Sequence, residues 1–69
     1  MPVHDLVVNA VEKWRAKENA TQEELAKDVG VTRQTIIAIE RGNYTPSVSL
    51  AIKIARRFRV PVERLFWIQ

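Results

Sequence analysis

The spacing of two helix signals in the middle of the chain constrains its fold more than any other feature. Thr21 and Glu24 have the spacing of a capping box, in which two side chains cap each other's backbone amides at a helix start. Gly30 follows where that helix would end, because glycine adopts the left-handed conformation of a helix terminus without strain. Thr32 then caps a second helix that begins at Arg33. The turn between Gly30 and Arg33 is too short for the two helices to pack antiparallel. They must therefore cross steeply, and one of them projects from the body of the domain.

Length and composition favour a single small domain over residues 1–69. The chain has 69 residues with no cysteine and one histidine, His4, so neither a disulfide framework nor a zinc cluster is expected. A hydrophobic content of 46% favours a packed fold. A domain this short buries only about 60% of its unfolded surface, which makes self-association a natural source of further buried area. No apolar run approaches the roughly 20 residues of a membrane span, and the amino terminus does not resemble a secretory signal.

Three further helices are predicted around the central pair. Asn9 and Glu12 have the spacing of an N-cap and its reciprocal acid for a helix that ends near Asn19, a residue type that tolerates positive φ. Ser47 caps a longer helix, whose apolar stripe consists of Leu50, Ala51, Ile54, Ala55 and Phe58. Pro61 opens a short last helix, which holds Val62, Leu65 and Phe66.

Charge is distributed unevenly along the chain. The net charge is +3, but residues 1–32 sum to −2 and residues 33–69 sum to +5. This asymmetry indicates either a surface for a polyanion in the second half of the chain or a solvated basic face without a partner.

The helix that begins at Arg33 has an outer face suited to a DNA groove. Arg33 lies in the first turn, where a cation opposes the helix dipole and where helix stability alone would favour an acid. Gln34 can donate to and accept from one base edge, and Ala38 is small enough for close approach to a duplex or contact with a thymine methyl. Thr32 and Thr35 add hydroxyls. The alternative is an ordinary solvated face.

These segments together resemble a known family. Residues 21–42 read TQEELAKDVGVTRQTIIAIERG, which is similar to the helix-turn-helix of the phage-repressor/Cro-like (Xre) family, and the similarity extends over about residues 9–66. The resemblance implies an all-α, compact five-helix, lambda-repressor-like fold, with a terminal strand pair in some short members. It also implies binding to operator DNA, usually as a dimer, in the regulation of transcription.

The resemblance implies a role for each matching position. Four residues at the second helix of the motif would face base edges, namely Thr32, Arg33, Gln34 and Ala38. Five residues would contact the DNA backbone, namely Gln22, Thr35, Arg41, Asn43 and Tyr44. Arg41, near a helix carboxyl end, would also be stabilising without DNA, and a packing role for Tyr44 under its loop is an equal alternative.

Arg15 and Glu40 are predicted to be structural. Glu40 lies near the carboxyl end of its helix, where an anion needs a partner. In the family, the matching positions form a partly buried ion pair that ties the first helix to the third.

Three residues depart from the family pattern. Ile37 stands where a small or polar residue is usual in the family. Its side chain either recognises a base by contact with a methyl group or is simply exposed. Arg59 occupies a helix end where glycine is common, and Ala20 replaces a larger apolar residue. The last two departures point to strain at Arg59 and looser packing at Ala20.

The apolar end of the chain has two interpretations. Phe66, Trp67 and Ile68 either fold back on the last helix or, as the hypothesis we favour, form a two-fold dimer interface together with it. Val7–Val8 and Trp67–Ile68 are candidates for a terminal strand pair, but Val3 and Val7–Val8 would equally suit an extension of the first helix. A dimer would place two recognition helices about 34 Å apart and predicts an inverted-repeat operator.

The sequence thus predicts a sequence-specific double-stranded DNA-binding transcriptional regulator, a homodimeric repressor associated with the nucleoid in the cytoplasm. The alternative is a protein-binding module, such as the antitoxin of a toxin–antitoxin pair that also binds its own promoter. An enzyme is not expected, because the sequence shows no nucleophile–histidine set and no glycine-rich phosphate loop. No cofactor, metal, membrane or small-molecule substrate is predicted, and His4 is expected to be inert.

Overall fold

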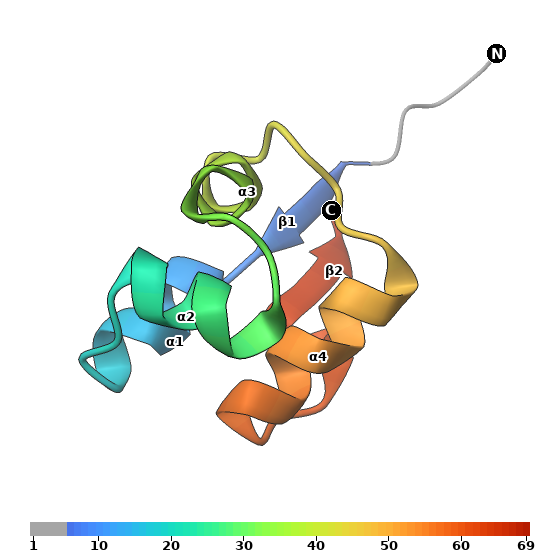
Figure 1. Ribbon diagram of the computed structural model, residues 1–69. Coiled ribbons are helices and arrows are strands. Elements are labelled where there is room, and N and C mark those ends of the chain that lie inside the picture. The colour runs from blue at the N-terminus through green and yellow to red at the C-terminus, as the bar shows by residue number, and fades with distance from the viewer. Residues whose placement is uncertain (1–5) are drawn as a thin grey trace, which may run out of the picture.

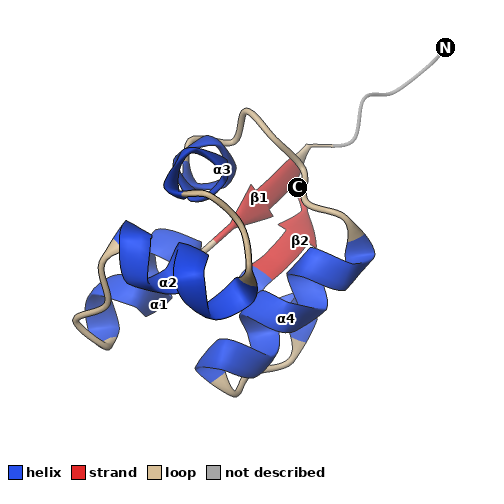
Figure 2. Ribbon diagram, in the orientation of Figure 1, coloured by secondary structure: helices blue, strands red, loops and turns tan. Residues whose placement is uncertain are grey.

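Five helices and two short strands make up the computed structural model, which describes residues 6–69 (Figure 1 and Figure 2). In chain order they are β1 (Val7–Asn9), α1 (Val11–Lys17), α2 (Gln22–Val29), α3 (Arg33–Glu40), α4 (Val48–Phe58), α5 (Val62–Leu65) and β2 (Phe66–Ile68). The predicted set of five helices is confirmed, and residues 7–9 form a strand instead of extending α1. Val3 and His4 lie outside the described residues.

The α2–α3 unit starts and turns at the residues that the sequence signals indicate. Thr21 and Glu24 form both halves of the capping box, with 3.0 Å from the Glu24 amide to Thr21 Oγ1 and 2.8 Å from the Thr21 amide to Glu24 Oε1. Gly30 ends α2 with a φ of +78°, and the Thr32 side chain accepts from the Thr35 amide at the start of α3. Figure 1 shows α3 nearly end-on and α2 from the side, so the two helices cross steeply.

Two predicted helix boundaries are wrong. Asn9 is not the N-cap of α1, because its backbone belongs to β1; Ala10 is the N-cap, although the Asn9 side chain still accepts from the Val11 amide at the start of α1. The predicted reciprocal bond from Glu12 is therefore not made. Phe66 is not helical, because α5 stops at Leu65 and Phe66 pairs with Asn9 as the first residue of β2. In both cases strand pairing between the chain ends overrides the local helix signal.

The core is built from side chains of all five helices among the described residues. Its most deeply buried members, each less than 2% exposed, are Val11, Leu25, Ile36, Ile39, Ile54 and Leu65. All five residues of the predicted apolar stripe of α4 are buried as well. Burial of one large aliphatic side chain contributes about 1.5–3 kcal/mol. The core therefore fixes the inner side of α3 and leaves its other side accessible.

The terminal segments form an antiparallel strand pair. β1 and β2 pair in the register Val7↔Ile68, Val8↔Trp67 and Asn9↔Phe66. Backbone bonds extend the pairing at both ends, from the Ala10 amide to the Leu65 carbonyl and from the Gln69 amide to the Leu6 carbonyl, each at 2.9 Å. Figure 2 shows the two strands side by side. None of the helices within residues 6–69 is long and apolar enough to cross a membrane.

Within residues 6–69, two non-glycine residues adopt positive φ: Asn19 at +55°, as predicted, and Arg59 at +59°. This conformation costs an ordinary L-residue roughly 1–2 kcal/mol, and glycine adopts it without that cost. We expect Arg59→Gly to raise the free energy of unfolding by about 0.5–1 kcal/mol, after allowance for the greater freedom of unfolded glycine. Urea denaturation measures the change, with Lys53→Gly inside α4 as a control that should lower stability by about 1 kcal/mol. An Arg59→Gly protein less stable than the parent would contradict strain at this position.

Candidate nucleic-acid interface

The two sides of α3 differ in chemistry. Ile36 and Ile39 are buried against the core. The four residues predicted to face bases are exposed or half-buried, namely Thr32, Arg33, Gln34 and Ala38. A helix that presents a polar side in this way matches the major groove of a duplex, which is about 12 Å wide.

No acid offsets the dipole at the start of α3. The first turn contains no Asp or Glu, and Arg33 forms no salt bridge or side-chain hydrogen bond with any residue that the structure describes. A cation beside the positive end of a helix costs a few tenths of a kcal/mol. Arg33 is exposed, so its guanidinium is accessible to an acceptor or anion outside the molecule.

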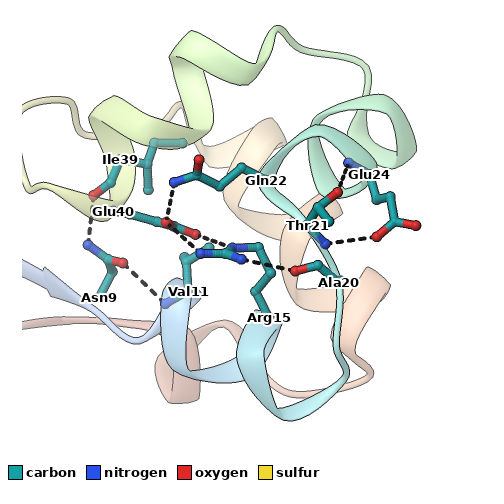
Figure 3. Close-up of polar contacts among 9 residues, drawn as sticks. All are labelled: Asn9, Val11, Arg15, Ala20, Thr21, Gln22, Glu24, Ile39 and Glu40. Carbon is teal, nitrogen blue, oxygen red and sulfur yellow. Dashed lines mark hydrogen bonds and ion pairs between the residues drawn. The ribbon is translucent and has the colours of Figure 1, made fainter.

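A buried carboxylate joins α1, α2 and α3 behind this surface (Figure 3). Arg15 Nε donates to Glu40 Oε2 at 2.7 Å and Arg15 Nη2 donates to Glu40 Oε1 at 3.1 Å. Arg15 Nη1 also donates to the Ala20 carbonyl at 3.0 Å, just before α2. The Glu40 side chain is only 5% exposed, and its hydrogen bonds raise the pKa of the Arg15 guanidinium. Glu40, the acid of α3, is therefore turned inward. Ala20, where the sequence predicts looser packing, is buried.

Gln22 belongs to the same network. Its side-chain Nε2 donates to Glu40 Oε1 at 3.0 Å, so one amide hydrogen is held inside the molecule (Figure 3). A primary amide has two such hydrogens, and the second is left for a further acceptor. Gln22 is half-buried in the first turn of α2, beside a shallow hollow that it shares with Arg33. The predicted phosphate contact at Gln22 is compatible with this position.

The other residues predicted to contact the DNA backbone lie at α3 and in the turn that follows it. Arg41, Asn43 and Tyr44 are exposed; Tyr44 is 47% exposed, which leaves part of its surface accessible to a phosphate and part of it covered. Thr35 is half-buried, and its hydroxyl lies 3.1 Å from that of Thr32. The exposed charged residues of α3 and the turn that follows it, Arg33 and Arg41, are therefore both basic.

Ile37, whose role the sequence leaves open, is half-buried. It lines a second shallow hollow beside α3, together with Glu12, Gln22, Arg33, Glu40 and Arg41. Its side chain therefore lies between the two exposed arginines of this surface.

An apolar groove between the start of α4 and the terminal strands was missed by sequence reasoning. It is lined by Val7, Thr45, Pro46, Val48, Ala51, Ile52, Val62 and Phe66. Val48 is 76% exposed and Ile52 is 38% exposed. Two apolar residues four apart on the outer side of an amphipathic helix are the signal that points to such a surface. Of the apolar tail, Phe66 is half-buried, and Trp67 and Ile68 are 43% and 63% exposed.

Comparison with known proteins agrees with this geometry. A helix-turn-helix family model matches residues 11–65. The chain is 57% identical over 58 residues to an uncharacterized HTH-type transcriptional regulator of Methanocaldococcus jannaschii, an alignment that covers 84% of this chain and 88% of the relative. It is 33% identical over 51 residues to the cryptic phage CTXphi transcriptional repressor RstR of Vibrio cholerae, which covers 74% of this chain and 46% of the repressor.

A solved structure has the same fold. The hypothetical transcription factor NHTF from Neisseria superposes with a TM-score of 0.72 at 28% identity over 78% of this chain. This chain spans 62% of that protein, which is less than two thirds of its length. The family match covers most of the chain and includes both α2 and α3. The chain therefore belongs to the Xre/Cro-like helix-turn-helix family of DNA-binding transcriptional regulators.

Proposed function

We propose that the protein binds double-stranded DNA at specific sequences and represses transcription by occupying a promoter. The accessible side of α3 carries the proposal, because it begins with exposed Arg33 and Gln34 while its acid, Glu40, is held in the interior. In a major groove, arginine pairs most often with guanine and glutamine with adenine. The similarity to a phage repressor supports the direction of regulation.

The proposed contacts divide into two sets. Base edges are read by Thr32, Arg33, Gln34 and Ala38. Phosphates are bound by Gln22, Thr35, Arg41, Asn43 and Tyr44. The first set sets the preferred sequence, and the second fixes the register of α3 on the duplex.

We further propose a homodimer that buries the apolar groove and the tail. Val48 and Ile68 are exposed, and Phe66 lines the groove beside α4; Trp67, also part of the proposed interface, is exposed on the other face of the strand pair. Several large apolar side chains gathered on one surface usually mark an interface. A two-fold pair would place the two α3 helices about 34 Å apart, so the operator would be an inverted repeat.

Selection of bound sequences from random duplexes at stated salt tests this function. We expect an enriched inverted repeat with half-sites one helical turn apart, and an affinity that falls steeply as salt rises. Recovery of no motif would contradict sequence-specific binding. Recovery of one unrepeated half-site would contradict the dimer and retain the DNA-binding role.

Ile68→Thr is expected to convert the dimer to a monomer. Threonine keeps the strand propensity of this position but removes much of its exposed apolar surface. Sedimentation velocity at tens of micromolar protein should show a dimer of the 8.0 kDa chain for the parent and for the control Gln69→Thr. A monomeric parent protein would refute the proposed interface.

A further inference from the structure

Asn9 joins the terminal strands to the end of α3 (Figure 3). Its Nδ2 donates to the Ile39 carbonyl at 2.8 Å, and its Oδ1 accepts from the Val11 amide at 3.1 Å. Asn9 itself lies in β1, where it pairs with Phe66 of β2. One carboxamide therefore connects β1 with both α1 and α3, and both of its polar ends are used.

The Ile39 carbonyl belongs to the turn that ends α3. It also accepts from the Gly42 amide at 2.9 Å, and the Asn43 amide donates to the Ala38 carbonyl at 2.9 Å. These paired bonds, with Gly42 at a φ of +78°, form a Schellman motif. Asn9 holds this motif from a position 30 residues away in the sequence.

No other side chain in residues 6–69 bonds to the backbone of this motif, residues 38–43. The side chains of Ile39 and Glu40 hold the end of α3 to the core and to Arg15, and among the described residues Asn9 adds the one side-chain bond to the backbone of the turn itself. That turn carries three of the proposed phosphate contacts, namely Arg41, Asn43 and Tyr44. A small rotation of the helix end would move all three relative to the bases that α3 reads.

We propose that Asn9 is a positioning residue for DNA binding, which fixes the end of α3 and its turn against the terminal strands. This inference rests on the proposed DNA-binding function. The same strands carry the apolar tail of the proposed dimer interface, residues 66–68.

Asn9→Asp is a nearly isosteric test. The carboxylate still accepts from the Val11 amide, but it cannot donate to the Ile39 carbonyl and places a negative charge beside the negative end of α3. Asn9→Ser is the neutral counterpart, because its hydroxyl is suited to the nearby Val11 amide and is too short to span to Ile39. Gln69→Glu, beyond the end of β2, makes the same change from carboxamide to carboxylate and controls for added charge.

Amide hydrogen exchange without DNA is the first readout. We expect the Gly42 and Asn43 amides to exchange roughly fivefold faster in both Asn9 variants, as the loss of one hydrogen bond predicts. The Gly30 amide, in the turn between α2 and α3, should keep the exchange rate of the parent. Unchanged exchange at Gly42 would overturn the anchoring role.

Affinity for the selected duplex over a range of salt concentrations is the second readout. We expect both Asn9 variants to bind roughly fivefold more weakly or worse, with a salt slope reduced by about 1, whereas Gln69→Glu keeps the parental slope. A residue that only stabilises the fold would change the melting temperature but not the slope of the folded protein.

Parental affinity and slope in Asn9→Ser would overturn the proposal, and this neutral variant decides the result if Asn9→Asp does not fold. Failure of the parent protein to select any duplex would overturn the proposed function and the DNA-binding part of this inference together. The exchange measurement distinguishes the two failures, because it reports on the Asn9 anchor in the absence of DNA.

Discussion

Replacement of Arg15 by methionine is expected to lower the free energy of unfolding by about 3–5 kcal/mol. Both oxygens of the Glu40 carboxylate accept from Arg15, and the Glu40 side chain is only 5% exposed. Without the guanidinium this charge remains buried with the Gln22 amide as its remaining side-chain donor among the described residues. A chain of 69 residues has a total stability of roughly 3–10 kcal/mol, so the loss would unfold a large share of the protein.

Urea denaturation of two further variants separates this buried pair from a surface pair. Arg57 also bonds two acids, Asp28 at 2.6 Å and Glu18 at 2.9 Å, but the side chains of these acids are 43% and 39% exposed. Arg57→Met should therefore cost less than about 1 kcal/mol. The double variant Arg15→Met/Glu40→Leu should recover most of the loss, because it removes the stranded charge. Equal destabilisation by Arg15→Met and Arg57→Met would show that burial does not matter here.

Arg33→Ala is expected to weaken binding to the selected duplex by about 1–3 kcal/mol and to relax the preference at one base pair of each half-site. The stability of the protein should stay unchanged or rise by a few tenths of a kcal/mol, because the guanidinium opposes the dipole of α3. A change that lowers affinity without lowering stability is expected of a residue whose partner lies outside the molecule.

Duplex selection with Arg33→Ala and with Arg64→Ala measures this effect. Arg64 is an exposed cation on α5, so its loss should leave the selected motif unchanged while removing the same formal charge. If Arg33→Ala selected the parental motif with parental affinity, Arg33 would not be a base-reading residue.

The starts of α2, α3 and α4 were predictable because their capping bonds are local. The caps at Thr21, Thr32 and Ser47 each join residues three apart, so the order of side chains along the chain is sufficient to place them. The polar side of α3 follows from the same short-range spacing, which placed Arg33 and Gln34 on the accessible side of the helix.

Contacts between distant residues were not predictable in the same way. The carboxamide of Asn9 suits an N-cap, and only the pairing of Asn9 with Phe66 turns it toward the Ile39 carbonyl. Phe66 likewise continues the apolar pattern of α5, and its strand conformation depends on a partner at the other end of the chain. The third bond to the Glu40 carboxylate, from Gln22, requires the steep crossing of α2 and α3 to be known. Each of these side chains fits more than one local conformation or hydrogen bond, and contacts with distant residues determine which one forms.

Titration of isotope-labelled protein with the selected duplex, followed by amide chemical shifts, tests most directly whether the accessible side of α3 binds DNA. We predict that the largest changes fall on residues 32–38 and on the turn over residues 41–44. The protein offers a second basic surface, where Lys13, Lys17 and Arg64 surround Trp14 and Trp67. Changes centred on that surface, with the amides of α3 unmoved, would contradict DNA recognition by α3.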